Sequence, residues 1–291
     1  MASAKKDFMG TASTNPADPE ISVVLPCYRS AGLARLSADR LARFLDETFA
    51  SYEIVVVDDG GGDFDGSWPE EGPIRLLRLP ANRGKGAAVR AGMLASRGRV
   101  RVFTDVDLPF ELEPILASAC FITERGFHLV IGDRTLPGSS YALDVGWRRR
   151  LASVVFSKLV GIFLTGGFFD TQCGFKAFRG DVAQGLFGLS RIDRFAFDVE
   201  LLYLALLYRT DIKRIPVQLR NNETSAVRLL RDSLRMLLDV GKIRLFAWRG
   251  AYRSLTLARI VADDFAEVAA STADAAEQSR RRAQGSHHRG H

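Results

Sequence analysis

The sequence predicts an α/β fold in which helices cover both faces of an open, mostly parallel sheet. Short runs rich in Val and Ile, such as "ISVVLP" at 21–26 and "YEIVVVDD" at 52–59, are typical of buried strands. Segments with helical periodicity separate these runs along the chain. Such alternation favours parallel strands, because each helix carries the chain back across the sheet.

The first hundred residues account for half of this pattern. Each strand is expected to end in Pro, in acidic residues or in a Gly-rich turn. The elements expected there are a strand at 21–26, a helix at 32–50, a strand at 52–59, a strand at 74–79, a helix at 86–97 and a strand at 99–105.

The second half should continue the α/β pattern and end in amphipathic helices. Its expected elements are a helix near 111–125, a strand at 127–133, an apolar helix from 147, the segment 168–178, a helix beginning near 197, a strand at 211–219 and a long helix from about 227. We expect a disordered polar N-terminus at 1–20, one domain at 21–250, and a helical extension with a disordered basic tail at 251–291.

Composition narrows the class of protein. The chain has 291 residues, of which 47% are hydrophobic, and a net charge of +6 that favours an anionic partner. Cys27, Cys120 and Cys173 are too scattered for a zinc site and indicate a reducing, cytoplasmic compartment. No apolar run reaches the roughly 20 residues that cross a bilayer. We therefore expect a protein that is soluble or lies on the cytoplasmic face of a membrane.

Four polar motifs follow the first four strands: "PCYRS", "DDGGGD", "NRGKG" and "DVDLP". The carboxyl ends of parallel strands share one edge of a sheet, where α/β proteins bind ligands. "NRGKG" lacks the spacing of a phosphate-binding Walker A loop, and the first strand lacks a dinucleotide fingerprint. Nucleoside triphosphate hydrolysis and hydride transfer are therefore disfavoured.

The motif Asp105-Val106-Asp107 can present two carboxylates from an extended backbone. Carboxylates are suitable ligands for Mg²⁺ or Mn²⁺, and such an ion can bridge substrate phosphates. Paired acids also occur by chance or as helix caps, so this motif alone does not define a metal site.

Together the motifs resemble the inverting family 2 glycosyltransferases of the GT-A fold, in the branch of dolichyl-phosphate β-glucosyltransferases and polyprenyl-phosphate glycosyltransferases. The resemblance covers roughly residues 21–247 in the family's order. The runs that carry it are "VVLPCYRS", "YEIVVVDDGGGD", "NRGKGAAVRAGMLASRG", "FTDVDLPF", "VIGDR", "DTQCGFKAFRGDVA", "RFAFDVELL", "IPVQL" and "RLLRDSLRML".

The resemblance implies a role for each matching residue. Residues implied to bind the nucleotide sugar are Pro26, Tyr28, Asp58, Asp59, Lys85, Asp105 and Arg134. Asp107, together with Asp105, is implied to ligate Mg²⁺ or Mn²⁺ on the diphosphate. Residues implied to act in catalysis are Asp107, Asp170, Asp198 and Lys176. Residues implied to bind the acceptor are Gln172, Glu200, Arg220 and Arg228, and either arginine could replace a family lysine that is Ala226 here.

The nature of the acceptor decides whether a general base is needed. A hydroxyl acceptor requires one, and Asp198 or Asp170 are the candidates. A phosphomonoester carries about −1.5 to −2 charges near pH 7 and is already nucleophilic. Asp198 could equally be an acid that stabilises the start of its helix.

Basic residues accompany two apolar helices. Arg148, Arg149 and Arg150 open the first, and Arg228, Arg231, Arg235 and Lys242 recur along the second. Interfacial helices that bind anionic membranes show this pattern, although a solvated face or a buried core helix would also explain it. No nucleic-acid-binding motif is present, so nucleic acid is not an expected partner.

We therefore expect metal-dependent, inverting transfer of a hexose to a polyprenyl phosphate at a membrane surface. UDP-glucose is the first choice of donor by resemblance, and GDP-mannose is the second. A glycosyltransferase acting on a soluble hydroxyl acceptor and a non-catalytic nucleotide-sugar-binding scaffold remain alternatives. The sequence leaves the oligomeric state open.

Overall fold

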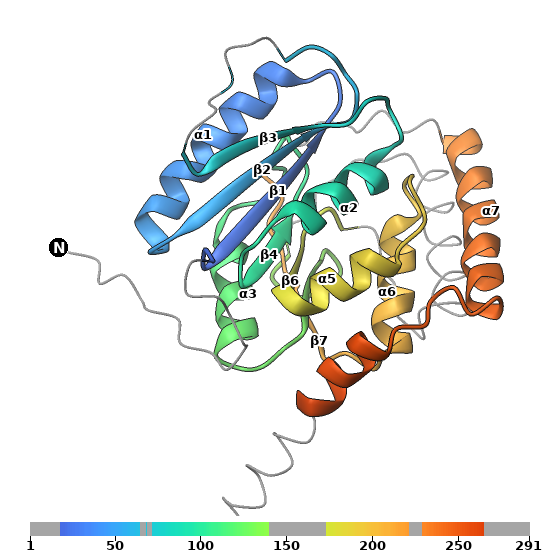
Figure 1. The fold of residues 1–291 in the computed structure, drawn as a ribbon. Helices are drawn as coiled ribbons and strands as arrows, with labels where there is room; N and C mark the ends of the chain where they lie inside the picture. Colours follow the sequence, from blue (N-terminus) through green and yellow to red (C-terminus); the bar gives the residue numbers. More distant parts are fainter. Residues whose placement is uncertain (1–17, 65–67, 69–71, 140–172, 221–228, 265–291) are drawn as a thin grey trace, which may run out of the picture.

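The computed structural model confirms the open α/β sheet expected from the sequence (Figure 1). It describes residues 18–64, 68, 72–139, 173–220 and 229–264. Most of the predicted N-terminal segment, the apolar helix predicted from residue 147 and the predicted basic tail lie outside the described residues.

The sheet has seven strands in the order β3-β2-β1-β4-β6-β5-β7. Their bounds are Ile21–Cys27 (β1), Tyr52–Asp58 (β2), Ile74–Arg78 (β3), Val100–Phe103 (β4), Leu129–Asp133 (β5), Lys176–Arg179 (β6) and Ile212–Pro216 (β7). Among these seven, β6 is antiparallel to both of its neighbours, and the remaining pairs are parallel. Sequence analysis did not identify β6 as a strand.

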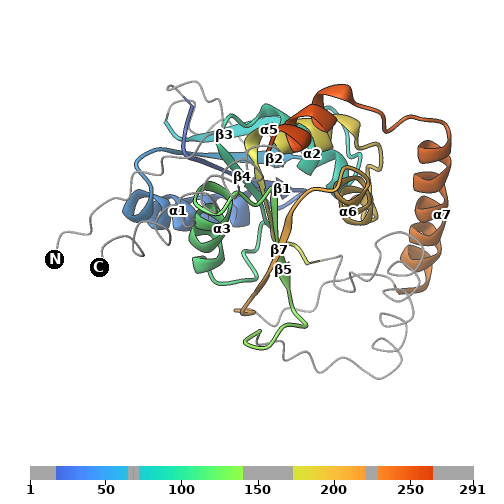
Figure 2. The ribbon, with the colours of Figure 1, turned by 90° about the horizontal axis from the view of Figure 1, so that it is seen from below.

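Helices cover both faces of the sheet (Figure 2). Their bounds are Ala31–Thr48 (α1), Lys85–Ala95 (α2), Glu113–Thr123 (α3), Gly180–Leu189 (α5), Phe197–Leu207 (α6) and Leu229–Trp248 (α7). α1 and α3 pack on one face, whereas α2, α5 and α6 pack on the other. Sequence analysis missed α5.

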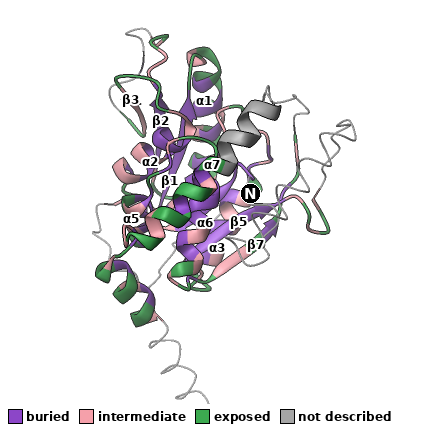
Figure 3. Cartoon of the chain, turned by 90° about the vertical axis from the view of Figure 1, so that its right-hand side faces the viewer, coloured by how far each residue is buried: buried purple, intermediate pink, exposed green. Residues whose placement is uncertain are grey.

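β1 and β2 are mostly apolar because both of their faces are buried (Figure 3). In β1, Val23 and Leu25 contribute to the core beneath α1 and α3. Val24, between them, contributes to the core beneath α2, α5 and α6. The period of two in side-chain direction therefore supplies both cores from a single strand.

The chain does not leave the domain at residue 250. Tyr252, Leu257 and Val261 are buried in the same core as α6. At the end of this segment, Asp264 accepts a hydrogen bond from Arg179 at 2.7 Å and lies 2.8 Å from Nε2 of His128. The described part of the predicted extension is therefore packed onto the sheet's helical layer.

α7 lies outside α6 and turns part of its surface to solvent (Figures 1 and 3). Ile243 is buried in the core, whereas Leu238, Leu245 and Trp248 are exposed. No helix in the described ranges combines the length and apolar character needed to span a bilayer.

A buried carboxylate links three neighbouring strands near their amino ends, opposite to the edge where the parallel strands end. Glu53 on β2 accepts hydrogen bonds from the Ser22 hydroxyl on β1 and the Arg75 guanidinium on β3, both at 2.7 Å. It also accepts the backbone N–H of Arg97. Burial alone would raise the pKa of Glu53, but these donors outweigh it and lower the pKa.

We expect Glu53→Gln to lower the free energy of unfolding by about 1–3 kcal/mol near pH 7, because three charge-assisted bonds are weakened. The native pKa of Glu53 lies below its ordinary value of 4.5. Its stabilisation is therefore complete above that value and is lost as pH falls through the lowered native pKa. Urea unfolding of both proteins across acidic pH measures the difference.

The matched control is Glu47→Gln, which removes an exposed carboxylate on α1 and should change stability by no more than about 0.5 kcal/mol. A difference between wild type and Glu53→Gln that persists unchanged into strong acid would contradict the assigned role of the carboxylate.

Candidate active site

The polar motifs meet at one edge of the sheet. β1, β2, β3 and β4 are parallel and end at this edge, and β6 begins there because it runs antiparallel to β4. In this register Lys176, the first residue of β6, lies opposite Phe103, the last residue of β4. The antiparallel strand therefore adds a cation to an edge that already carries the acidic motifs.

Asp58 and Asp59 shape two loops of this edge through backbone N–H groups. Asp58 Oδ1 accepts the N–H of Gly61 at 2.7 Å. The two oxygens of Asp59 accept the N–H groups of Arg83 at 2.9 Å and Gly84 at 2.8 Å. Both side chains are buried. Asp58 and Asp59 therefore hold the loops that surround the site. Their contact with a nucleoside stays a prediction.

The loops after β2 and β3 touch at Gly60. This residue has a φ of 70°, and a side chain on it would overlap the backbone of Ala81. Both the left-handed backbone and the close approach require glycine. The contact fixes the acidic loop after β2 against the basic loop that leads into α2.

Tyr28 provides an exposed aromatic ring at the end of β1. Pro26 is buried within the strand, whereas Tyr28 is 42% exposed. The guanidinium of Arg29 lies 5.1 Å from the centre of the Tyr28 ring. Aromatic rings of this kind can stack on a nucleobase, so the position suits the predicted role of Tyr28.

Two lysine–carboxylate pairs stand at the centre of the edge. Lys85, in the first turn of α2, forms an ion pair with Asp105, which follows β4. Lys176 Nζ lies 2.6 Å from Asp198 Oδ1 and donates to the carbonyl oxygen of Cys173 at 2.9 Å. The Lys176–Asp198 pair is buried, and the Lys85–Asp105 pair is partly exposed.

The charges of these two pairs influence one another. Burial opposes the charged form of Lys85, but Asp105, Asp198 and Asp107 outweigh it and raise the pKa of Lys85. Burial raises the pKa of Asp198, although Lys176 and Lys85 act in the opposite direction. Lys85 is therefore cationic at neutral pH and is suited to binding an anion.

Asp107 lies on a tight turn that is tied to the segment after β7. The N–H of Leu108 donates to the carbonyl oxygen of Asp105 at 3.0 Å. The N–H of Arg220 donates to the carbonyl oxygen of Pro109 at 2.7 Å. Asp107 and Arg220 are both exposed, so the structure brings a predicted metal ligand and a predicted acceptor contact to neighbouring loops.

The two carboxylates after β4 fit a hard divalent ion. Asp105 has room for its carboxylate because residue 174 is glycine, and a side chain there would overlap Oδ2 of Asp105. In the part of the chain that the structure describes, no three His, Cys, Asp or Glu side chains form a metal cage. An ion held by Asp105 and Asp107 would therefore take its other ligands from water and phosphate, as Mg²⁺ commonly does.

Arg134 lies at the same edge on the far side of β6. It directly follows β5, which runs in the same direction as β4 because both are antiparallel to β6. Its neighbour Asp133 is held by the Arg214 guanidinium at 2.6 Å. A phosphate contact by Arg134 stays a prediction, as do the roles of Asp170, Gln172 and Arg228, which lie outside the described residues.

The structure does not support the acceptor-binding role predicted for Glu200. Its carboxylate is fully buried and accepts the N–H groups of Arg191 and Ile192 at 2.9 Å and the hydroxyl of Tyr252. Residues two apart on a helix point to different sides. Glu200 therefore faces the C-terminal segment, although Asp198 on the same helix faces Lys176.

Sequence analysis also missed Asp193, which fixes the approach of α6 to α2. Its carboxylate pairs with Arg83 at 3.0 Å and with Arg90, and its carbonyl oxygen accepts the N–H of Ala87 at 3.0 Å. These arginines precede Asp193 by more than a hundred residues, so local patterning gives no sign of the contact. Asp193 thereby positions the turn that carries Lys85 beside the start of α6.

Comparison with known proteins identifies the family. Residues 22–187 match the family described as glycosyl transferase family 2. The chain is 33% identical to a dolichyl-phosphate β-glucosyltransferase of Dictyostelium discoideum over 250 residues, which cover 79% of this chain and 76% of the relative. It is 31% identical to the Saccharomyces cerevisiae enzyme of that name over 255 residues, covering 80% and 76%.

Solved structures share the fold at lower identity. Glucosyl-3-phosphoglycerate synthase from Mycobacterium tuberculosis, solved with Mn²⁺ and UDP-glucose, has a TM-score of 0.53 at 19% identity and covers 76% of this chain and 77% of its own. For mannosyl-3-phosphoglycerate synthase from Rubrobacter xylanophilus these values are 0.52, 17%, 81% and 77%. The predicted GT-A fold is confirmed, and by its family match the chain belongs to the family 2 glycosyltransferases.

Proposed function

We propose that this enzyme transfers glucose from UDP-glucose to a polyprenyl phosphate, with Mg²⁺ or Mn²⁺ bound at the diphosphate. The observation that carries the proposal is the edge that holds the ion pairs Lys85–Asp105 and Lys176–Asp198, with the exposed carboxylate of Asp107 two residues after Asp105. The names of the curated relatives supply glucose and dolichyl phosphate. The bound Mn²⁺ and UDP-glucose of the mycobacterial synthase agree with the choice of metal and donor.

Binding of the donor would draw on three parts of the edge. Tyr28 offers a ring for the base, and Lys85 offers a positive charge for the diphosphate. Asp107, with Asp105, would hold the divalent ion. The bound ion would stabilise the negative charge that develops on the leaving UDP.

Asp198, the one candidate general base among the described residues, favours a phosphate over a hydroxyl as the acceptor. A general base must be free to accept a proton, whereas Asp198 is buried and bonded to Lys176. A lipid phosphate needs no such base, because it is already anionic near pH 7. The protein then has to position the phosphate opposite the leaving UDP, so that attack inverts the anomeric carbon.

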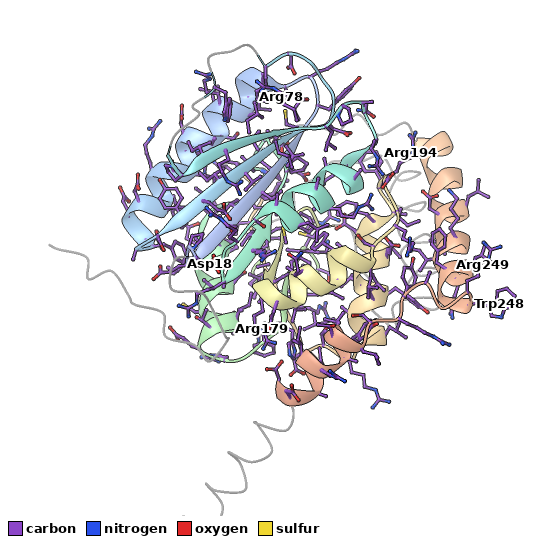
Figure 4. All side chains as sticks on the ribbon, in the orientation of Figure 1. Asp18, Arg78, Arg179, Arg194, Trp248 and Arg249 are labelled. Carbon is purple, nitrogen blue, oxygen red and sulfur yellow. The ribbon has the colours of Figure 1, made fainter. Side chains whose placement is uncertain are left out.

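The outer side of α7 supports a membrane-bound acceptor. Leu238, Leu245 and Trp248 are 63%, 39% and 84% exposed and lie at spacings of seven and three residues. Lys242 and Arg249 are exposed near them, and Trp248 and Arg249 project away from the domain (Figure 4). Apolar and aromatic side chains flanked by cations are typical of helices that lie in an anionic membrane surface.

We expect Asp107→Ala to lower kcat/KM for glucose transfer by about 100-fold or more, because one metal ligand is lost. The assay is UDP release from UDP-glucose with a short polyprenyl phosphate and Mn²⁺, with and without EDTA. The fold should persist, since Asp107 is exposed.

Glu113→Ala is the matched control, because Glu113 is a nearby exposed acid on α3. It should retain transfer. Full activity of Asp107→Ala, or turnover that EDTA does not reduce, would overturn the metal assignment. Turnover with GDP-mannose in place of UDP-glucose would correct the donor. No turnover with either would favour a non-catalytic scaffold.

We expect the protein to float with vesicles that contain anionic phospholipid, and to float less at high salt because the attraction to cations is screened. Replacing both Leu245 and Trp248 with Ser should reduce flotation further, since the apolar contacts are removed. Leu36→Ser is the control, because Leu36 is 69% exposed but lies on α1. No flotation at any salt concentration would point to a soluble acceptor.

A further inference from the structure

Lys85 contacts Asp105, one of the two residues that would hold a divalent ion. Its ammonium pairs with Oδ1 of Asp105. The other oxygen, Oδ2, lies so close to the backbone of Gly174 that a side chain there would overlap it. One carboxylate oxygen of Asp105 therefore pairs with a cation, and the other lies against the backbone of Gly174.

Asp107 is the remaining carboxylate of the predicted metal site. With Asp105 engaged, a divalent ion arriving alone would meet a single exposed carboxylate. Mg²⁺ dehydrates reluctantly and is usually bound through carboxylates together with substrate phosphates. The arrangement therefore disfavours binding of the ion before the nucleotide.

We propose that Lys85 and the divalent ion compete for Asp105, so that the ion binds tightly only together with a nucleoside diphosphate. This inference rests on the proposed function, because the ion and the diphosphate belong to it. The diphosphate supplies oxygen ligands for the ion and also an anionic partner for Lys85. The Lys85 ammonium thus pairs with Asp105 in the free enzyme. In the complex it pairs with the diphosphate instead.

The structure allows this exchange to occur by movement of the Lys85 side chain alone. The preceding backbone is fixed, because Asp59 accepts the N–H groups of Arg83 and Gly84. The Lys85 side chain is 21% exposed, so it retains access to the open edge. Its charge is also stabilised by Asp198, so leaving Asp105 does not leave the ammonium without a carboxylate nearby.

The test measures Mn²⁺ binding by the electron paramagnetic resonance signal of free Mn²⁺, first with the ion alone and then with UDP. We expect Lys85→Gln to bind Mn²⁺ alone about tenfold more tightly than wild type, because a competing positive charge is removed. Lys85→Arg keeps the charge and should resemble wild type. With UDP present, the advantage of Lys85→Gln should disappear because a diphosphate contact is lost.

Asp105→Asn gives a second measurement that does not depend on the folding of Lys85→Gln. Its affinity for Mn²⁺ alone should stay within about twofold of wild type, because Asp105 is not available to the free ion. With UDP, its affinity should fall by about tenfold or more. Circular dichroism confirms that each variant is folded.

Two results would overturn the competition and leave the proposed function standing. One is that Lys85→Gln binds Mn²⁺ alone no more tightly than wild type, while wild type binds it with UDP. The other is that Asp105→Asn loses as much affinity without UDP as with it. If wild type binds no Mn²⁺ even with UDP, the metal-dependent function is overturned together with the competition.

Discussion

The buried ion pair between Lys176 and Asp198 is the interaction on which the site depends. Removing one partner of such a pair leaves an uncompensated buried charge, which costs about 3–5 kcal/mol. The pair joins the start of β6 to the start of α6. β6 must therefore run against its neighbours for its lysine to reach the edge where the parallel strands end. The direction of β6 and the position of the Lys176–Asp198 ion pair therefore depend on each other.

The carboxylates around this pair fall into two groups, which differ in their exposure to solvent. Asp58 and Asp59 are buried, accept backbone N–H groups and hold the loops in register. Asp105 and Asp107 stay at least partly open to solvent. The same residue type thus fixes the loops around the site and, at Asp105 and Asp107, keeps carboxylates accessible to solvent. The division follows from burial, because an enclosed carboxylate must be fully hydrogen-bonded.

Most strands, and the edge where the polar motifs meet, were predictable because local patterning determines them. Buried parallel strands such as β1 and β2 are continuous apolar runs, and the motifs after them follow directly in sequence. β6, α5 and the contacts of Asp193 depend on partners far away in the chain, which periodicity does not reveal. Glu200 was misassigned for a similar reason, since its nearness to Asp198 in sequence hides the fact that the two side chains leave α6 in different directions.

The packing of residues 252–264 bears on where this enzyme can be cut. By composition alone, a fragment ending near residue 250 would seem a sensible expression boundary. Such a fragment would remove the hydroxyl that Tyr252 donates to the enclosed Glu200 and the carboxylate that Asp264 offers to His128 and Arg179. It would also uncover the core beneath Leu257. Residues 252–264 are therefore part of the packed domain, and an expressed fragment that keeps these contacts has to extend at least to Asp264.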